Sequence, residues 1–169
     1  MLQALPAPPG EAGLGAAGAA RFQLSLELTI RALNESDLDS LDWDSERAIR
    51  APDVARSLRE RGDAVEWLGA FVGRAPVGRI GIDYERAGPS VGHLWAFSVL
   101  PALQRHGIGT RLLDAAERRL RERGGRLAEI GVERDNHNAR RLYERRGYTH
   151  HAEAVGHDGE PITLLRKCV

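Results

Sequence analysis

The 169-residue sequence contains a single cysteine, Cys168, and a single lysine, Lys167, and both lie close to its C-terminal end. One cysteine cannot form an intrachain disulfide, which excludes a disulfide-stapled scaffold and fits a reducing compartment. The formal net charge is +0, so the charge balance gives no reason to expect nucleic acid or an anionic membrane as an obligatory partner. No stretch is long and apolar enough to span a bilayer. We therefore expect a cytoplasmic protein with neither a nucleic-acid nor a membrane partner.

The first 20 residues are rich in Ala, Gly and Pro. No Lys or Arg precedes Arg21 and no long apolar core is present, so we expect no secretory signal there. Such a composition is typical of a disordered tail or of a segment added for expression. The remaining length suits one domain with a sizeable core. We predict a tail over residues 1–22 and a single domain over residues 23–169.

A glycine-containing segment lies between an apolar run that ends at Val99 and a helical pattern that starts with Leu112. The first amides of a helix have no carbonyl partner within it, and the helix dipole favours negative charge there. Glycines in such a turn let a phosphate approach the backbone closely. The segment is neither a nucleotide P-loop nor a dinucleotide fingerprint, because the Lys-Ser/Thr pair and the glycine spacing of those motifs are missing. The residues predicted to bind a pyrophosphate, with an ordinary helix start as the alternative, are Gln104, Arg105, His106, Gly107, Ile108, Gly109 and Thr110.

A second pattern covers residues 136–148 and follows another apolar run. Ala139, Leu142 and Tyr143 are spaced i, i+3, i+4, so they share one helix face. Gly147 is placed to end that helix in a left-handed cap. Asn136 suits the N-cap of the same helix.

Together the two segments resemble the GNAT family of N-acetyltransferases, which transfer an acetyl group from acetyl-CoA to an amine. Residues 104–109 meet the family pattern Gln/Arg-x-x-Gly-x-Gly/Ala, and residues 136–148 meet Asn-x-x-Ala-x-x-Leu-Tyr-x-x-x-Gly-Phe/Tyr. The resemblance covers residues 27–167 and is best over 76–148. It implies acetyl-CoA as co-substrate and a small-molecule or protein amine as acceptor, and it leaves homodimerisation open. No metal is expected, because the spacing of His150, His151, His157 and Asp158 matches no common zinc pattern.

The apolar periodicity predicts strands alternating with helices. The expected strands are 26–31, 67–72, 76–84, 92–99, 127–132, 148–155 and 162–166, with a hairpin turn at 73–75. The expected helices are 37–43, 52–61, 110–123 and one that follows Asn136. The pairs Asp114–Arg118 and Glu117–Arg121 are expected on the solvent side of the helix at 110–123. The resemblance implies an α/β (mixed α+β) fold, with a mixed central sheet flanked by helices and splayed between the strands at 92–99 and 127–132, where pantetheine lies in the family.

The resemblance also assigns roles to residues. Main-chain groups at the end of the strand that carries Phe97 and Val99 would align the thioester, and Asn136 would face the cofactor. Tyr143 occupies the family's tyrosine position and is the candidate general acid, because a phenol with a pKa of about 10 holds a proton that it can give to a departing thiolate. A core aromatic packed on the helix face is the alternative.

His93 is the candidate general base. Alternation places His93, Trp95, Phe97 and Val99 on one strand face, and imidazole titrates near neutrality, so it can take a proton directly or through water. A simply hydrogen-bonded histidine is the alternative. Ribosomal-protein acetyltransferases of the family carry a glutamate near the position of Gly131 here, and Glu133 lies further along the same face. This departure weakens a protein N-terminus as the acceptor.

Two charge clusters each allow a functional and a solvent-exposed interpretation. Residues 37–46 carry an acidic run of Asp37, Asp39, Asp42, Asp44 and Glu46, which we expect to be a solvated surface rather than an amine-attracting one. The cluster of Arg140, Arg141, Arg145 and Arg146 either touches the adenosine phosphates or is simply exposed.

The overall prediction is direct acetyl transfer to a primary amine through a ternary complex, because the terminal Cys168 is not placed to carry an acetyl group. The alternative is a non-catalytic acyl-CoA-binding regulatory module with the same fold.

Overall fold

The computed structural model describes residues 26–41, 50–156 and 159–169 of the chain. The strands are β1 (Leu28–Ala32), β2 (Val65–Val72), β3 (Ala75–Asp83), β4 (Val91–Val99), β5 (Leu127–Glu133), β6 (Thr149–Val155) and β7 (Pro161–Cys168). The α-helices are α1 (Ala51–Arg61), α2 (Ile108–Glu122) and α3 (His137–Arg145), joined by the 3-10 helices η1 (Glu35–Ser40), η3 (Gly62–Ala64) and η4 (Pro101–Leu103).

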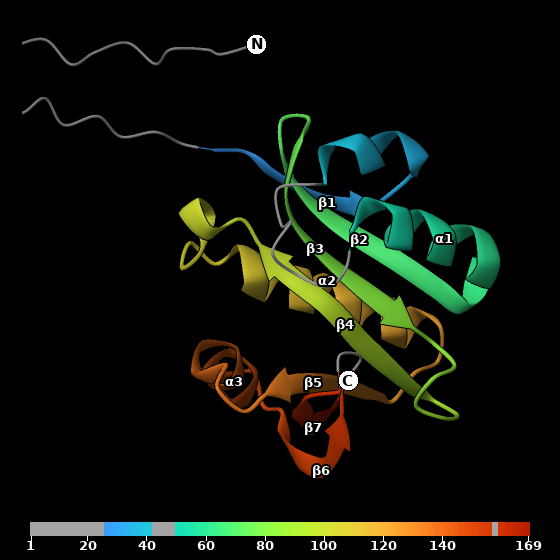
Figure 1. Ribbon diagram of the computed structural model, residues 1–169, viewed down its shortest axis with the longest axis vertical. Coiled ribbons are helices and arrows are strands. Elements are labelled where there is room, and N and C mark those ends of the chain that lie inside the picture. Colours follow the sequence, from blue (N-terminus) through green and yellow to red (C-terminus); the bar gives the residue numbers. More distant parts are fainter. Residues whose placement is uncertain (1–25, 42–49, 157–158) are drawn as a thin grey trace, which may run out of the picture.

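The seven strands form one sheet in the order β1-β2-β3-β4-β5-β7-β6. All neighbouring pairs are antiparallel except β4 and β5, which are parallel and are connected through α2. Figure 1 shows α1 on the side of the sheet that faces the viewer and α2 behind it. The predicted mixed sheet flanked by helices is therefore confirmed. The last hairpin folds so that its second strand, β7, lies between β5 and β6.

Each face of the sheet has its own apolar core. On the α2 face, Leu112 and Leu120 of the helix are buried against Leu94 and Ile130 of the central strands. On the opposite face, a smaller cluster around Trp67 includes Val54 of α1. Burying one such large apolar side chain contributes about 1.5–3 kcal/mol, so the two cores fix β2, β3 and β4 as a rigid platform.

Helix α2 starts two residues before the predicted position. Its N-cap is Gly107, in the left-handed region at φ 80°, and Gly124 stands just past its other end with the same φ of 80°. These two glycines supply the positive φ that the turns on either side of the helix require.

Glu117 of α2 corrects the predicted solvent-side pairing. It is only 3% exposed, because it lies four residues after Leu113 and three before Leu120, on the apolar face. Its carboxylate accepts hydrogen bonds from Lys167 Nζ at 2.7 Å and from the Tyr148 hydroxyl at 3.1 Å. A helical wheel of the sequence already places Glu117 on the apolar face. The prediction of a solvent-side pair instead followed the i,i+4 spacing of Glu117 and Arg121.

Asp114 also differs from the prediction, because it pairs with Arg146 of the α3–β6 connection and not with Arg118. That ion pair joins the helix of the first motif to the end of the second motif.

The segment before α1 also differs from the prediction. In place of a helix at 37–43 the chain forms the 3-10 helix η1, and residues 42–43 lie outside the described part. Asp37, expected to be solvated, is 8% exposed, and its two carboxylate oxygens each accept a hydrogen bond from Arg31 at 2.7 Å. Asp39 is exposed as expected, while Asp42, Asp44 and Glu46 lie outside the described residues.

The predicted hairpin at 73–75 is confirmed, with Gly73 at φ 60° in the turn between β2 and β3. The tail predicted over residues 1–22 lies outside the described residues, and the single domain over 23–169 stays a prediction. Among the helices of the described part, none combines the length and the apolar character needed to cross a membrane.

Candidate active site

The parallel strands β4 and β5 pair over only part of their length. Their register runs from Val91↔Leu127 to Leu94↔Ile130, although β4 continues to Val99 and β5 to Glu133. In Figure 1 the arrowheads of both strands point to the same side of the molecule but lie apart. The predicted splay is thus confirmed. It leaves residues 95–99 of β4 outside the β4–β5 ladder, where backbone groups can serve a ligand.

A β-bulge interrupts β4 where the strands part. The register with β3 shifts between Arg79 and Gly81, so that Ala96 and Phe97 together oppose Ile80. Ala96 has a φ of +48°, which is uncommon for a residue with a side chain. Bulges re-aim side chains and backbone groups, and they occur often beside functional sites.

The bulge reverses the strand's alternation, so the prediction of one shared face is wrong beyond Ala96. Trp95 lies with its ring centroid 4.7 Å from that of Trp67, on the face away from α2. Phe97 and Val99 instead pack against the core of the α2 face. His93 stays on the same face as Trp95, because no irregularity separates these two residues.

The segment 104–110 forms the turn into α2 as predicted. The helix's own backbone bonding begins with Arg111 N–H to the Gly107 carbonyl at 3.1 Å, so the three amides of residues 108–110 precede it. Gln104 ties the turn to the end of β4 through a 3.0 Å hydrogen bond from its Nε2 to the Val99 carbonyl. The N-terminus of α2 is therefore held beside the parted end of β4.

The side chains of this turn leave its backbone open. Arg105 and His106 are exposed, and His106 Nδ1 donates to the Gln104 carbonyl at 2.8 Å. A Cβ added at Gly107 would meet nothing within 4 Å, whereas one added at Gly109 would lie 3.0 Å from Phe97 Cζ. Open space, unpaired amides and a nearby guanidinium are what a phosphate group needs.

Tyr143 lies on α3 and is 4% exposed. Its ring centroid is 6.1 Å from that of Phe97 on β4 and 6.0 Å from that of Tyr148. Asn136 caps the helix, accepting a hydrogen bond from Ala139 N–H at 3.1 Å, and Gly147 has the predicted left-handed conformation at φ 87°. Contact with Phe97 places Tyr143 beside the parted stretch of β4.

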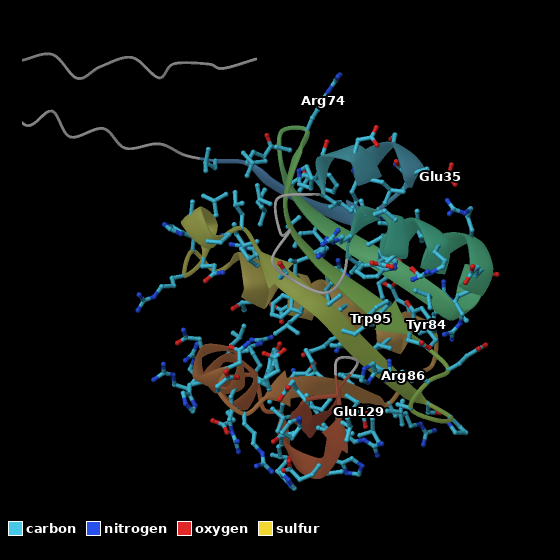
Figure 2. The ribbon with its side chains drawn as sticks, in the orientation of Figure 1. Glu35, Arg74, Tyr84, Arg86, Trp95 and Glu129 are labelled. Carbon is cyan, nitrogen blue, oxygen red and sulfur yellow. The ribbon has the colours of Figure 1, made fainter. Side chains whose placement is uncertain are left out.

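His93 is buried, with 7% exposure, and its Nδ1 lies 3.1 Å from Oε1 of the equally buried Glu129 on β5. Arg166 Nε on β7 donates to the other oxygen, Oε2, at 2.8 Å. Figure 2 labels Glu129 on β5 together with Trp95 and Arg86. Glu129 and Arg166 were not predicted from the sequence, because only the strand register brings them into line with His93.

Burial is the largest influence on the imidazole and lowers the pKa of His93, while the hydrogen bond to Glu129 opposes the shift and Arg86 adds to it. Burial acts to raise the pKa of Glu129, but the hydrogen bonds from Arg166 and His93 outweigh it and hold that pKa below its usual value. At neutral pH the pair therefore consists of a neutral imidazole beside an ionised carboxylate.

Gly131 stands near the position where the resemblance would place a glutamate, and a side chain there would require the tip of the Ile162 side chain to shift. A Cβ at this position would lie 2.9 Å from Ile162 Cδ1 on β7. Glu133 is exposed at the end of β5. Neither residue is brought to His93, whose carboxylate partner is Glu129.

The other candidate clusters stay apart from this site. Three of the four arginines over 140–146 have partners: Arg140 pairs with Glu144 and Arg141 with Asn138 within α3, and Arg146, just past α3, pairs with Asp114 of α2. Within the described residues no group of three or more His, Cys, Asp or Glu side chains is placed to hold a metal, and His157 and Asp158 lie outside them.

Two hollows, of about 470 and 320 Å³, lie where β4 and β5 begin, away from the parted ends. Neither is lined by a residue of the turn at 104–110 or by Tyr143.

Comparison with known proteins identifies the class to which this fold and site belong. The acetyltransferase (GNAT) family model matches residues 31–148, and the chain belongs to this family. Ard1 from Thermoplasma volcanium is 21% identical with a TM-score of 0.72, covering 84% of this chain and 97% of its own.

Two further solved structures are similar at comparable levels. The ribosomal-protein-S18-alanine N-acetyltransferase from Escherichia coli is 20% identical with a TM-score of 0.70, covering 85% of this chain and 94% of its own. The structure of yncA from Salmonella typhimurium, solved with its cofactor acetyl-CoA, is 18% identical with a TM-score of 0.69, covering 83% of this chain and 93% of its own. No curated protein sequence matches the chain significantly.

The turn into α2 yields a test of cofactor binding. We expect Gly107→Val to raise the acetyl-CoA dissociation constant at least tenfold, about 1.4 kcal/mol, because a branched side chain at φ 80° strains the turn and occupies the open space above the amides. Gly124→Val is the matched control, since Gly124 has the same φ and equally open surroundings at the other end of α2. Equal affinities of the two folded variants in calorimetry would contradict the assignment.

Proposed function

We propose that this protein is an acetyl-CoA-dependent N-acetyltransferase that moves the acetyl group directly to a primary amine within a ternary complex. The observation that carries the proposal is the parted end of β4, which has the open helix N-terminus of α2 on one side and the buried His93–Glu129 pair just before the parting. The acceptor is a small-molecule or protein amine.

The residues present fit the co-substrate. The amides of residues 108–110, with Arg105 beside them, would bind its pyrophosphate, and the bulge at Ala96 and Phe97 would present backbone groups to the thioester. Acetyl-CoA supplies an activated acetyl group. The acetyl-CoA bound to yncA, whose fold this chain shares, supports the same cofactor here.

Two side chains supply the proton transfers. His93, neutral at pH 7, accepts the proton that the amine loses as its nitrogen forms the new C–N bond. Tyr143 donates a proton to the sulfur as the C–S bond breaks. Tyr143 lies beside the parted stretch of β4 and His93 just before it, so both substrates would have to be held there together, which favours direct transfer over an acetylated enzyme.

A panel of primary amines, assayed for release of CoA thiol, tests the proposal. Amine-dependent release that saturates with both substrates supports it. Tight acetyl-CoA binding without turnover on small amines and on peptide amines would favour the non-catalytic regulatory module.

The single thiol, Cys168, is exposed, and it supports a cytoplasmic location.

The base assignment predicts a pH profile. Because the pKa of His93 lies below its usual value of about 6.5, the imidazole stays neutral at pH 7, and kcat/KM should fall only as the pH drops below that value. We expect His93→Ala to lower kcat/KM most near neutral pH and to remove this acidic limb. His150→Ala is the control, because His150 is exposed on β6 and pairs with Glu153. An unchanged pH profile of kcat/KM in His93→Ala would show that His93 has only a structural role.

A further inference from the structure

A row of polar side chains crosses the sheet on the face away from α2. The strand register aligns Asp83 of β3 with His93 of β4, His93 with Glu129 of β5, and Glu129 with Arg166 of β7. His93 and Glu129 form the last pair but one before β4 and β5 part. We call these four residues the polar row. Its central pair, His93 and Glu129, lies next to the point where β4 and β5 part, which is where a base would be needed.

Hydrogen-bond geometry within the polar row settles which nitrogen of His93 carries the proton. Glu129 is held ionised between Arg166 and His93, so both of its oxygens can only accept hydrogen bonds. A neutral His93 must therefore carry its proton on Nδ1, facing Glu129 Oε1. The other nitrogen, Nε2, then bears the lone pair, and it has no hydrogen-bond partner among the described residues.

We propose that Glu129, anchored by Arg166, is a positioning residue that fixes His93 in the Nδ1–H tautomer and so makes Nε2 the basic atom of the site. Oriented imidazoles in other enzymes depend on a carboxylate in the same way. The consequence for the rate rests on the proposed function, whereas the tautomer itself does not.

Several charges act on His93 from the surrounding elements. Glu129 and Asp83 favour its protonated form, and Arg86, in the β3–β4 connection, disfavours it. Arg166 acts through Glu129, and Arg61 of α1 acts through its 3.2 Å contact with Asp83. Because the direct charges partly offset one another, the distinguishing readout is which nitrogen is protonated, rather than the position of the titration alone.

Imidazole ¹⁵N NMR on the intact protein measures this directly, with the His93 signal identified by its loss in His93→Ala. We expect the neutral parent to show a protonated Nδ1 and an unprotonated Nε2. In Glu129→Gln the amide oxygen should turn to Arg166 and the amide NH₂ to Nδ1, which moves the proton to Nε2. Glu153→Gln is the matched control, because it makes the same change at a carboxylate that contacts a different histidine, His150, at 3.1 Å on the surface of β6. A parent His93 with its proton on Nε2 overturns the inference without any variant.

Kinetics separate positioning from support of the fold. Glu129→Gln should lower kcat/KM at least about tenfold in an otherwise parental protein, because Nε2 then carries a proton and cannot act as base. In a His93→Ala background the same change should alter the rate less than twofold, since Glu129 acts only through His93. An equal loss in both backgrounds overturns the inference. If Glu129→Gln reverses the tautomer without slowing acetyl transfer, Glu129 does fix the tautomer of His93, but His93 is not the general base.

Discussion

Replacing Tyr143 by phenylalanine is expected to lower the single-turnover rate of acetyl transfer about a hundredfold to ten-thousandfold, with acetyl-CoA affinity nearly unchanged. The ring packs between Phe97 and Tyr148, and Tyr143→Phe keeps it, so the packing of α3 on β4 should survive. The substitution removes one proton donor, whose effect is largest when charge develops on the leaving sulfur. Single-turnover measurement is required, because product release can mask a chemical step in kcat.

Tyr148→Phe provides the matched control for this experiment. Tyr148 is equally buried, at 1% exposure, and its hydroxyl donates to Glu117 in the core. Its removal should lower the free energy of unfolding by about 1.5–3 kcal/mol, because the acceptor is a carboxylate, and leave the transfer rate unchanged. If Tyr143→Phe transferred acetyl at the parental single-turnover rate, water or another group would have to supply the proton.

Most parts of the site that could be predicted from the sequence depend on local signals. The turn at 104–110 and the helix after Asn136 are specified by residues within one or two helical turns of each other, so spacing alone reveals them. Gly147 indicates a left-handed cap because few other residues tolerate positive φ. The splay of β4 from β5 followed from the family resemblance, because neither strand carries a pattern that marks where pairing ends.

The parts that the sequence did not predict are non-local. Ala96 adopts φ +48° although alanine has no preference for it, so the bulge, and with it the direction of Phe97, is imposed by the pairing with β3. Likewise, Glu129 appears in the sequence as one more charged residue of a strand. Its role depends on the registers that bring it to His93 of β4 and Arg166 of β7, which lie 36 and 37 residues away from it in the sequence.

The Glu117–Lys167 ion pair is a further non-local feature, and it joins α2 to the last strand. Glu117 is almost fully buried, with a side-chain exposure of 4%, while the Lys167 side chain is 21% exposed and its Nζ lies 2.7 Å from Glu117 Oε2. Lys167 Nζ also lies 5.6 Å from the centre of the Tyr148 ring. Removing the lysine would leave a carboxylate in the core with only one neutral hydrogen-bond donor, the Tyr148 hydroxyl.

We expect Lys167→Met to lower the free energy of unfolding by about 3 kcal/mol, because breaking a buried pair leaves an uncompensated charge. Adding Glu117→Gln should restore most of that loss, since the amide oxygen still accepts from Tyr148 while the buried charge is gone. Arg140→Met, which breaks the exposed Arg140–Glu144 pair of α3, should change the free energy by less than about 0.5 kcal/mol. Urea denaturation of the three variants and the parent measures these values. If the double variant were no more stable than Lys167→Met alone, the loss would come from the packing of the lysine stem on Tyr148, because removing the carboxylate's charge would then have relieved nothing.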